Sequence, residues 1–252
     1  MILKRVVEHI RQQHWTAVII ELAIVVLGVF IGLQVNNWND ARRDRVRELA
    51  YLEGIAADLD ESIVSIRESI GYSNDRRALD ELLIKAVADP DVVRAEPGRF
   101  MYAITRGGYT HSPSIRGDTF ETIKSTGDLG IIRDKKLVPD LMKFYATVQG
   151  QSQWGAFRVF CQSEYFKRSA GILTAEQLMR APSESGTIPT ADVEDAMAAY
   201  RRMLDRPDFI EWLPTTLFNR TTDLSFGKRW LADATALRAR ILAQPGVRAK
   251  DP

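Results

Sequence analysis

Residues Trp15–Val35 read WTAVIIELAIVVLGVFIGLQV, and this stretch decides the topology of the chain. Glu21 is the only ionisable side chain in the run. An α-helix rises about 1.5 Å per residue, so a run of this length spans about 30 Å, the thickness of the hydrocarbon core of a bilayer. The stretch therefore predicts one transmembrane helix, with the lipid bilayer as its partner.

Trp15 and Trp38 flank the apolar run, where amphipathic rings settle at a membrane surface, so we set the span at 15–38. A buried soluble helix would carry a polar face, which this run lacks. A cleaved signal peptide would have a shorter apolar run and a small-x-small cleavage site. Here the run ends in Gln34-Val35-Asn36-Asn37-Trp38 instead.

The flanks of the span are both basic. Residues 1–14 form a basic tail, and arginines stand after the span at Arg42, Arg43, Arg45 and Arg47. The positive-inside comparison is thus nearly balanced, but a short basic tail before an uncleaved first span usually stays in the cytoplasm. We expect a single-pass protein of a cell inner (cytoplasmic) membrane, with its large domain in the periplasm or otherwise extracytoplasmic.

One face of the predicted span is unusual. At about 100° per residue, Glu21, Gly28 and Gly32 fall on the same side of the helix. Gly28-x-x-x-Gly32 is a small-xxx-small pattern that lets two helix backbones approach closely. A carboxyl that faces lipid costs several kcal/mol, and a single span has no second helix of its own. The pattern predicts packing against copies of this chain or against a partner membrane protein.

Glu21 has two interpretations. It is a proton- or cation-handling group at an oligomer axis, or it is a carboxyl that hydrogen-bonds across the interface or is hydrated near the membrane surface. Its position, about 10 Å from the start of the span by the helical rise, is shallow enough for water and favours the second interpretation.

Composition bounds the rest of the chain. Apolar residues make up 45% and charged residues 27% of 252, which is ordinary for a globular protein. Beyond Glu21 the basic and acidic residues are equal in number, and a neutral domain argues against nucleic acid, which needs a concentrated basic face. Cys161 is the single cysteine, so no intrachain disulfide forms.

The part after the span reads as an all-α domain, because no strand alternation stands out. A seam with steps of three and four predicts a coiled coil or a long bundle helix, and it comprises Leu49, Leu52, Ala56, Leu59, Ile63, Ile66 and Ile70. We expect a helical arm and hairpin over 39–88 that turns at Asn74-Asp75, a helical extramembrane domain over 89–245, and a disordered tail over 246–252.

Local signals place the later helices. Asp118-Thr119-Phe120-Glu121 has capping-box spacing, and Gly127 is a stop. A long helix is expected over 135–169, a short one opened by Thr174-x-x-Gln177, another opened by Thr190, and a last one with Pro207 in its first turn. The row Gly227, Ala234 and Ile241 suggests that this last helix lies antiparallel to the arm and closes a bundle.

Two stretches carry a resemblance. Glu21–Asp40 (ELAIVVLGVFIGLQVNNWND) and Asp118–Tyr145 (DTFETIKSTGDLGIIRDKKLVPDLMKFY) are similar to motifs of an uncharacterised bacterial family, a domain-of-unknown-function group with one N-terminal span. The resemblance implies a membrane protein with an α-helical extramembrane domain, and it implies no reaction.

Candidate chemistry is sparse. His111 lies beside Ser112 and Ser114, but a nucleophilic serine needs a base oriented by a third group. Asp58, Asp60 and Glu61 read as a solvated face rather than metal ligands, and Cys161 reads as a core thiol among aromatics. Gly107-Gly108 lacks the Lys-Ser/Thr ending of a phosphate loop. A possible binding surface comprises Lys124, Ser125 and Gly127, although a capped helix, a glycine turn and the start of the next helix at Asp134 explain these residues better.

We therefore predict no catalytic residue, no metal ligand and no cofactor. The function expected is a non-enzymatic, membrane-anchored helical scaffold or interaction protein that forms a homo-oligomer through its span. The alternatives are an oligomeric ion- or proton-conducting component that uses Glu21, and a ligand-sensing extracytoplasmic domain that works with a partner.

Overall fold

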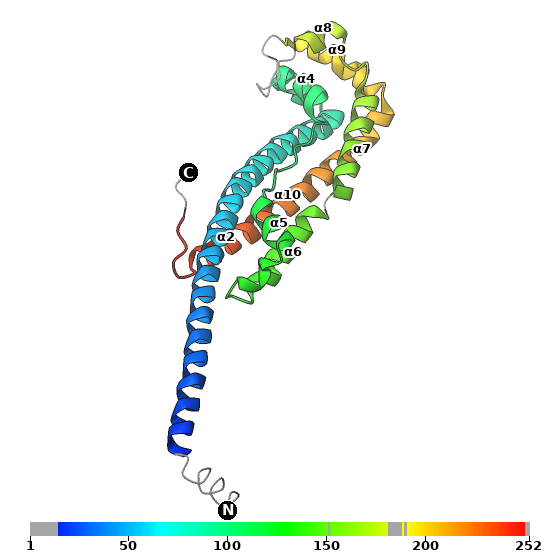
Figure 1. The fold of residues 1–252 in the computed structure, drawn as a ribbon. Coiled ribbons are helices and arrows are strands. Elements are labelled where there is room, and N and C mark those ends of the chain that lie inside the picture. Colours follow the sequence, from blue (N-terminus) through cyan, green and yellow to red (C-terminus); the bar gives the residue numbers. More distant parts are fainter. Residues whose placement is uncertain (1–14, 151, 181–187, 189–190, 250–252) are drawn as a thin grey trace, which may run out of the picture. The chain divides into compact units, whose positions relative to one another are not determined.

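A computed structural model describes residues 15–150, 152–180, 188 and 191–249. Every regular element within these residues is a helix, so the all-α class is confirmed (Figure 1). The elements are α2 (Trp15–Ala88), α3 (Asp91–Ala95), α4 (Pro97–Arg106), α5 (Asp118–Ser125), the short 3-10 helix η1 (Asp128–Ile131), α6 (Leu137–Gln149), α7 (Ser152–Ser169), α8 (Ala175–Met179), α9 (Val193–Leu204) and α10 (Pro207–Leu242). The chain divides into two units, residues 1–50 and 51–252.

The described part of the first unit is the N-terminal stretch of α2. Its large apolar side chains from Ile19 to Val35 are each between 57% and 64% exposed, so the unit itself covers none of them. Of the helices described, this is the one long and apolar enough to cross a membrane by length and composition. The basic tail at 1–14 lies outside the described residues.

In the second unit, α10 packs antiparallel to the later part of α2. Three contacts show the direction: Asp60 pairs with Arg238, a Cβ on Gly227 would lie 2.9 Å from Ile70, and Asp80 pairs with Arg220. Residue numbers rise along one helix as they fall along the other. The predicted antiparallel closure is therefore confirmed, and the two helices lie close together at Gly227, because a side chain there would strike Ile70.

Two apolar cores follow one another along this helix pair. The first core joins α2 to α5, α6 and the end of α10, and its members include Leu52, Leu59, Ile66, Phe120, Leu141, Trp230 and Ile241. The second core joins the end of α2 to α4, α7, α9 and the start of α10, and its members include Leu79, Leu83, Phe100, Tyr165, Met203 and Phe209. Burial of this apolar area is the main favourable term in folding.

The seam on α2 is buried inside the second unit. Leu52, Leu59 and Ile66 are at most 1% exposed and pack against other helices of the same chain. Of the two structures that the pattern allowed, the bundle helix is present, because the partner helices α5, α6 and α10 occupy the seam that a coiled coil between copies would need.

The turn expected at Asn74-Asp75 is wrong, because α2 continues without a break to Ala88. The apolar face continues past that point with Leu79, Leu83 and Ala86, all buried in the second core. Burial of these side chains outweighs the weak local preference of Asn and Asp for a turn. The chain reverses instead after Ala88, where Pro90 precedes α3.

The long helix expected over 135–169 is two helices that meet near Gly150, the C-cap of α6. The break lets both α6 and α7 pack against α10. The capping box expected at Asp118 is also wrong, since Gly117 is the N-cap of α5 and makes no side-chain bond. A side chain of α2 bonds the first turn of α5 instead, since the Thr119 N–H donates to Asp58 Oδ2 at 2.9 Å.

Other local signals are confirmed. Thr174 and Gln177 form a reciprocal capping box on α8, and Pro207 stands in the first turn of α10. Thr190 lies outside the described residues, and α9 begins behind Asp192 as N-cap. Two residues of the stretch expected to be a disordered tail make contacts: Val247 packs on the first core, and the Arg248 N–H donates to Glu53. Residues 250–252 lie outside the described part.

Candidate functional site

A band of buried polar side chains separates the two cores of the second unit. We call it the polar layer, and it consists of Ser69, Ser73, Arg76 and Asp80 on α2, Arg158 on α7, and Thr216, Arg220 and Asp223 on α10. Such groups are costly to bury unless each finds a partner. The polar layer is therefore the first place in the second unit to look for a functional site, because it gathers buried charged and hydrogen-bonding side chains.

Asp80 and Arg220 form the centre of the polar layer. Asp80 is fully buried, Arg220 is 3% exposed, and Arg220 Nε lies 3.6 Å from Asp80 Oδ2. Neither Asp80 oxygen accepts a hydrogen bond from the described residues. Burial raises the pKa of Asp80 to about 7, against the opposing influence of Arg220, Thr216 and Arg76. The carboxyl therefore titrates near neutral pH.

Arg220 also fixes the loop that follows α4. Its Nη2 donates to Gly107 O at 2.6 Å and to Tyr109 O at 2.7 Å. The two glycines at the start of the loop lie against Tyr165, whose hydroxyl donates to Ala103 O. A Cβ on Gly108 would lie 2.4 Å from that ring, so the glycine pair serves close packing.

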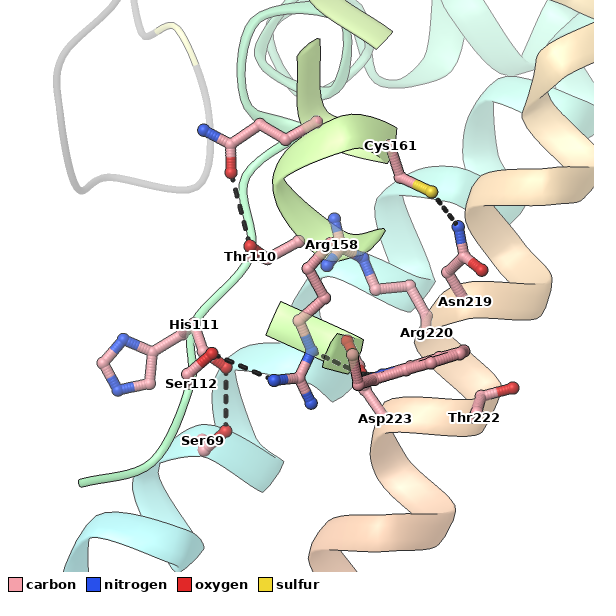
Figure 2. Close-up of polar contacts among 12 residues, drawn as sticks. Ser69, Thr110, His111, Ser112, Arg158, Cys161, Asn219, Arg220, Thr222 and Asp223 are labelled. Carbon is pink, nitrogen blue, oxygen red and sulfur yellow. Dashed lines mark hydrogen bonds and ion pairs between the residues drawn. The ribbon is translucent and has the colours of Figure 1, made fainter. Parts of the chain in front are cut away.

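A second charged pair extends the polar layer (Figure 2). Arg158 Nε donates to Asp223 Oδ1 at 2.8 Å, and both side chains are less than 10% exposed. The same Asp223 oxygen accepts from Trp154 Nε1, and Arg158 Nη1 donates to Ser112 Oγ. A carboxylate with two donors and an arginine with two acceptors is the satisfied arrangement that a buried pair needs.

The loop then runs along α2 over a ladder of short polar side chains. Ser69 Oγ donates to His111 O, Ser65 Oγ accepts from Ser114 N and Ser62 Oγ accepts from Arg116 N. The bond from Thr119 N to Asp58 completes the ladder. Positions 58, 62, 65 and 69 share one helix face, so one face of α2 supplies partners to the backbone of residues 111–119.

The solvated face expected at Asp58, Asp60 and Glu61 is wrong for Asp58, which is 9% exposed and accepts from the Thr119 N–H of α5. Asp60 is partly exposed and pairs with Arg238, and Glu61 is exposed and pairs with Arg116 at 3.5 Å. Their role is to hold other segments against α2. Within the described ranges, no group of three or more His, Cys, Asp or Glu side chains is arranged to hold a metal.

The candidate nucleophiles are engaged in packing. The His111 ring lies 5.5 Å from that of Tyr72, and Ser112 bonds Arg158 rather than a histidine. Cys161 is 6% exposed and its Sγ accepts from Asn219 Nδ2 at 3.0 Å, and burial raises the pKa of this thiol (Figure 2). A thiol held in its protonated form is a poor nucleophile.

The predicted association face lies open in the first unit. Glu21, Gly28 and Gly32 are all exposed, and a Cβ on either glycine would meet nothing within 4 Å. Trp38 is 69% exposed. The side chain of Trp15 lies outside the described part of the chain.

The possible binding surface at the end of α5 is used locally. Lys124 pairs with Glu121 at 3.1 Å, Ser125 Oγ donates to Thr122 O, and Gly127 takes the left-handed φ of 77° that ends the helix. The glycine stop is confirmed, and each of the three residues has a local structural contact.

The polar layer escaped prediction from sequence, although a signal was present. Arg76 and Asp80 stand on the same helix face as Leu83, so two charges interrupt an apolar row. Thr216, Arg220 and Asp223 repeat this on α10. Charged residues at positions that periodicity assigns to the core indicate buried ion pairs. The sequence does not say which residues pair, because the partners come together only in the tertiary structure.

Comparison of the chain with protein-family models, with curated proteins and with solved structures found no significant match.

Proposed function

We propose that this protein is a membrane-anchored helical scaffold, which holds its second unit at a bilayer surface and self-associates through the span. The observation that carries the proposal is the run of exposed apolar side chains from Ile19 to Val35 in α2. A contiguous apolar surface of this extent needs lipid or protein to cover it. The same helix continues into the cores of the second unit, so the anchor and the domain share one element.

Self-association is supported by the open face of the span. Gly28 and Gly32 present bare backbone with no neighbour, as close helix–helix packing in lipid requires. Glu21 shares that face, and burying its carboxyl against a second helix costs less than exposing it to lipid. The resemblance of Glu21–Asp40 to a bacterial single-span family supports a cytoplasmic membrane, with the second unit on its outer side.

A non-enzymatic role is supported by the positions of the reactive groups. Ser112, Cys161 and the Asp223 carboxylate each serve a structural bond inside the polar layer or beside it. The bond from Arg158 to Ser112 holds the loop after α4, and the bonds at Cys161 and Asp223 join α7 to α10. Rigid presentation is what an interaction protein needs.

The test is the oligomeric mass of the full-length chain in detergent, measured for wild type, Gly28→Ile and Ala23→Ile. Wild type is expected to be oligomeric, and Gly28→Ile to shift towards monomer because the added side chain keeps the backbones apart. Ala23→Ile is the matched control, since Ala23 falls on the other side of the helix. A monomeric wild type, or the same mass for all three proteins, contradicts self-association through this face.

A further inference from the structure

A cavity of about 310 Å³ in the second unit has the features of a ligand site, independently of the scaffold role. It lies where the ends of α4 and α7 meet the turn before α8. Its apolar lining comprises Ile104, Tyr109, Phe166, Leu173 and Leu178, and Thr105, Arg106 and Ser169 add the polar side chains. The volume falls in the range of small-molecule sites, as does the mixture of apolar walls and few polar groups.

Arg106 gives the cavity its charge. Its guanidinium lies 5.1 Å from the centre of the Tyr109 ring, and its Nε, which is buried, has no hydrogen-bond partner among the described residues. No carboxylate of the described chain forms an ion pair with it. A half-buried guanidinium without a counter-charge among the described residues favours an anion, and its planar fork matches a carboxylate.

The walls of the cavity are fixed by polar bonds behind them. Arg202 Nε donates to Ile172 O at 2.7 Å, and Arg206 donates to Ala170 O. Gly171 takes a φ of 86°, which allows the tight turn between them. Tyr109 and Phe166 meet edge to face at 4.9 Å. A site held in shape before the ligand arrives loses less entropy on binding.

We propose that this cavity binds a small carboxylate with an apolar, aromatic-sized body. The carboxylate meets Arg106, and the body lies against Phe166, Leu173 and Leu178. A bare inorganic anion leaves the apolar wall unfilled, and a neutral apolar molecule offers no charge to the Arg106 guanidinium. The geometry therefore favours a ligand that has both parts.

The test is calorimetric titration of the full-length chain in nanodiscs with naphthaleneacetate, its uncharged amide naphthaleneacetamide, and inorganic phosphate. Wild type is expected to bind the acid at least about tenfold more tightly than the amide, because a charge-assisted bond to Arg106 is lost in the amide. Phosphate is expected to bind more weakly than the acid.

Variants separate the two parts of the ligand. Arg106→Gln is expected to abolish the preference for the acid while still binding the amide, which also shows that the variant is folded. Arg99→Gln, a partly exposed position in the same helix, is the control and keeps the preference. Leu178→Ala weakens the acid and the amide alike. The proposal is overturned if wild type binds no acid at millimolar concentration, binds acid and amide equally, binds phosphate as tightly as the acid, or if Arg106→Gln keeps the preference.

Discussion

At the scale of single residues, the ionised form of the Asp80 carboxyl destabilises the fold because the side chain is buried. Its carboxyl is fully buried with an ion-pair contact of 3.6 Å to Arg220 but no hydrogen bond from the described residues. Burial raises its pKa from 3.8 to about 7. The folded state therefore binds the proton more tightly than the unfolded state does, and this carboxyl lowers stability as pH rises from about 4 to 7.

Asp80→Asn removes this titration. We expect the free energy of unfolding of the variant, relative to that of wild type, to increase as pH rises through that window and to level off above about pH 7, because only wild type loses stability there. Chemical denaturation of the two proteins at a series of pH values measures the difference. A difference independent of pH would show that Asp80 keeps an ordinary pKa in the fold.

Gly108 is a residue whose importance comes from what it touches. A Cβ there would lie 2.4 Å from the Tyr165 ring, which is fully buried and has little room to move. We expect Gly108→Ala to lower the free energy of unfolding by about 1–3 kcal/mol through overpacking. Gly155→Ala is the control, since open space surrounds that helical position, and it should stabilise α7 by up to about 1 kcal/mol. Equal effects at both sites in thermal melts would contradict the packing argument.

At the scale of elements, the ladder on α2 shows how a helix can order a loop that has no regular structure. Ser62 is fully buried, donates to Asp58 O and accepts from Arg116 N at 2.9 Å. The loop backbone therefore receives partners that a strand or helix would otherwise supply. In the first turn of α5, Asp58 of α2 likewise accepts from the N–H of Thr119.

Ser62→Ala tests the ladder. We expect the Arg116 amide to lose its acceptor and to exchange with solvent about tenfold faster, which corresponds to about 1.4 kcal/mol of local stability. Hydrogen exchange followed by NMR or mass spectrometry measures it. Ser163→Ala, at an exposed position on α7, should leave that amide unchanged. Protection that persists in Ser62→Ala would mean that the serine does not hold the loop.

At the scale of the whole molecule, one helix supplies both the membrane-length apolar run and a wall of each core in the second unit. Whether Glu21 in that run is structural or conducting separates the scaffold from its rival. A carboxamide keeps the shape and hydrogen-bonding capacity of the carboxyl but cannot carry a proton.

Glu21→Gln is therefore expected to preserve the oligomeric mass of the full-length chain. In proteoliposomes, wild type and variant should show the same background proton flux. A wild-type flux that disappears in Glu21→Gln would support the conducting function instead, and a monomeric variant would show that the charge itself drives assembly.

The amino-acid sequence alone was enough to predict the membrane-length run, the helical class, the seam on α2 and the cap of α8, because each rests on periodicity or on contacts between near neighbours. The antiparallel closing helix was also predicted, from the periodic row on that helix, although its contacts join residues far apart in the chain. Tertiary structure decided the path of α2 beyond Asn74, the division near Gly150, the polar layer and the cavity at Arg106. These depend on partners far apart in the chain, such as Asp80 with Arg220 and Asp58 with Thr119. A carboxylate in a sequence looks the same whether water or a distant backbone N–H satisfies it, and only the packing of α2 against α10 and the loop made that choice.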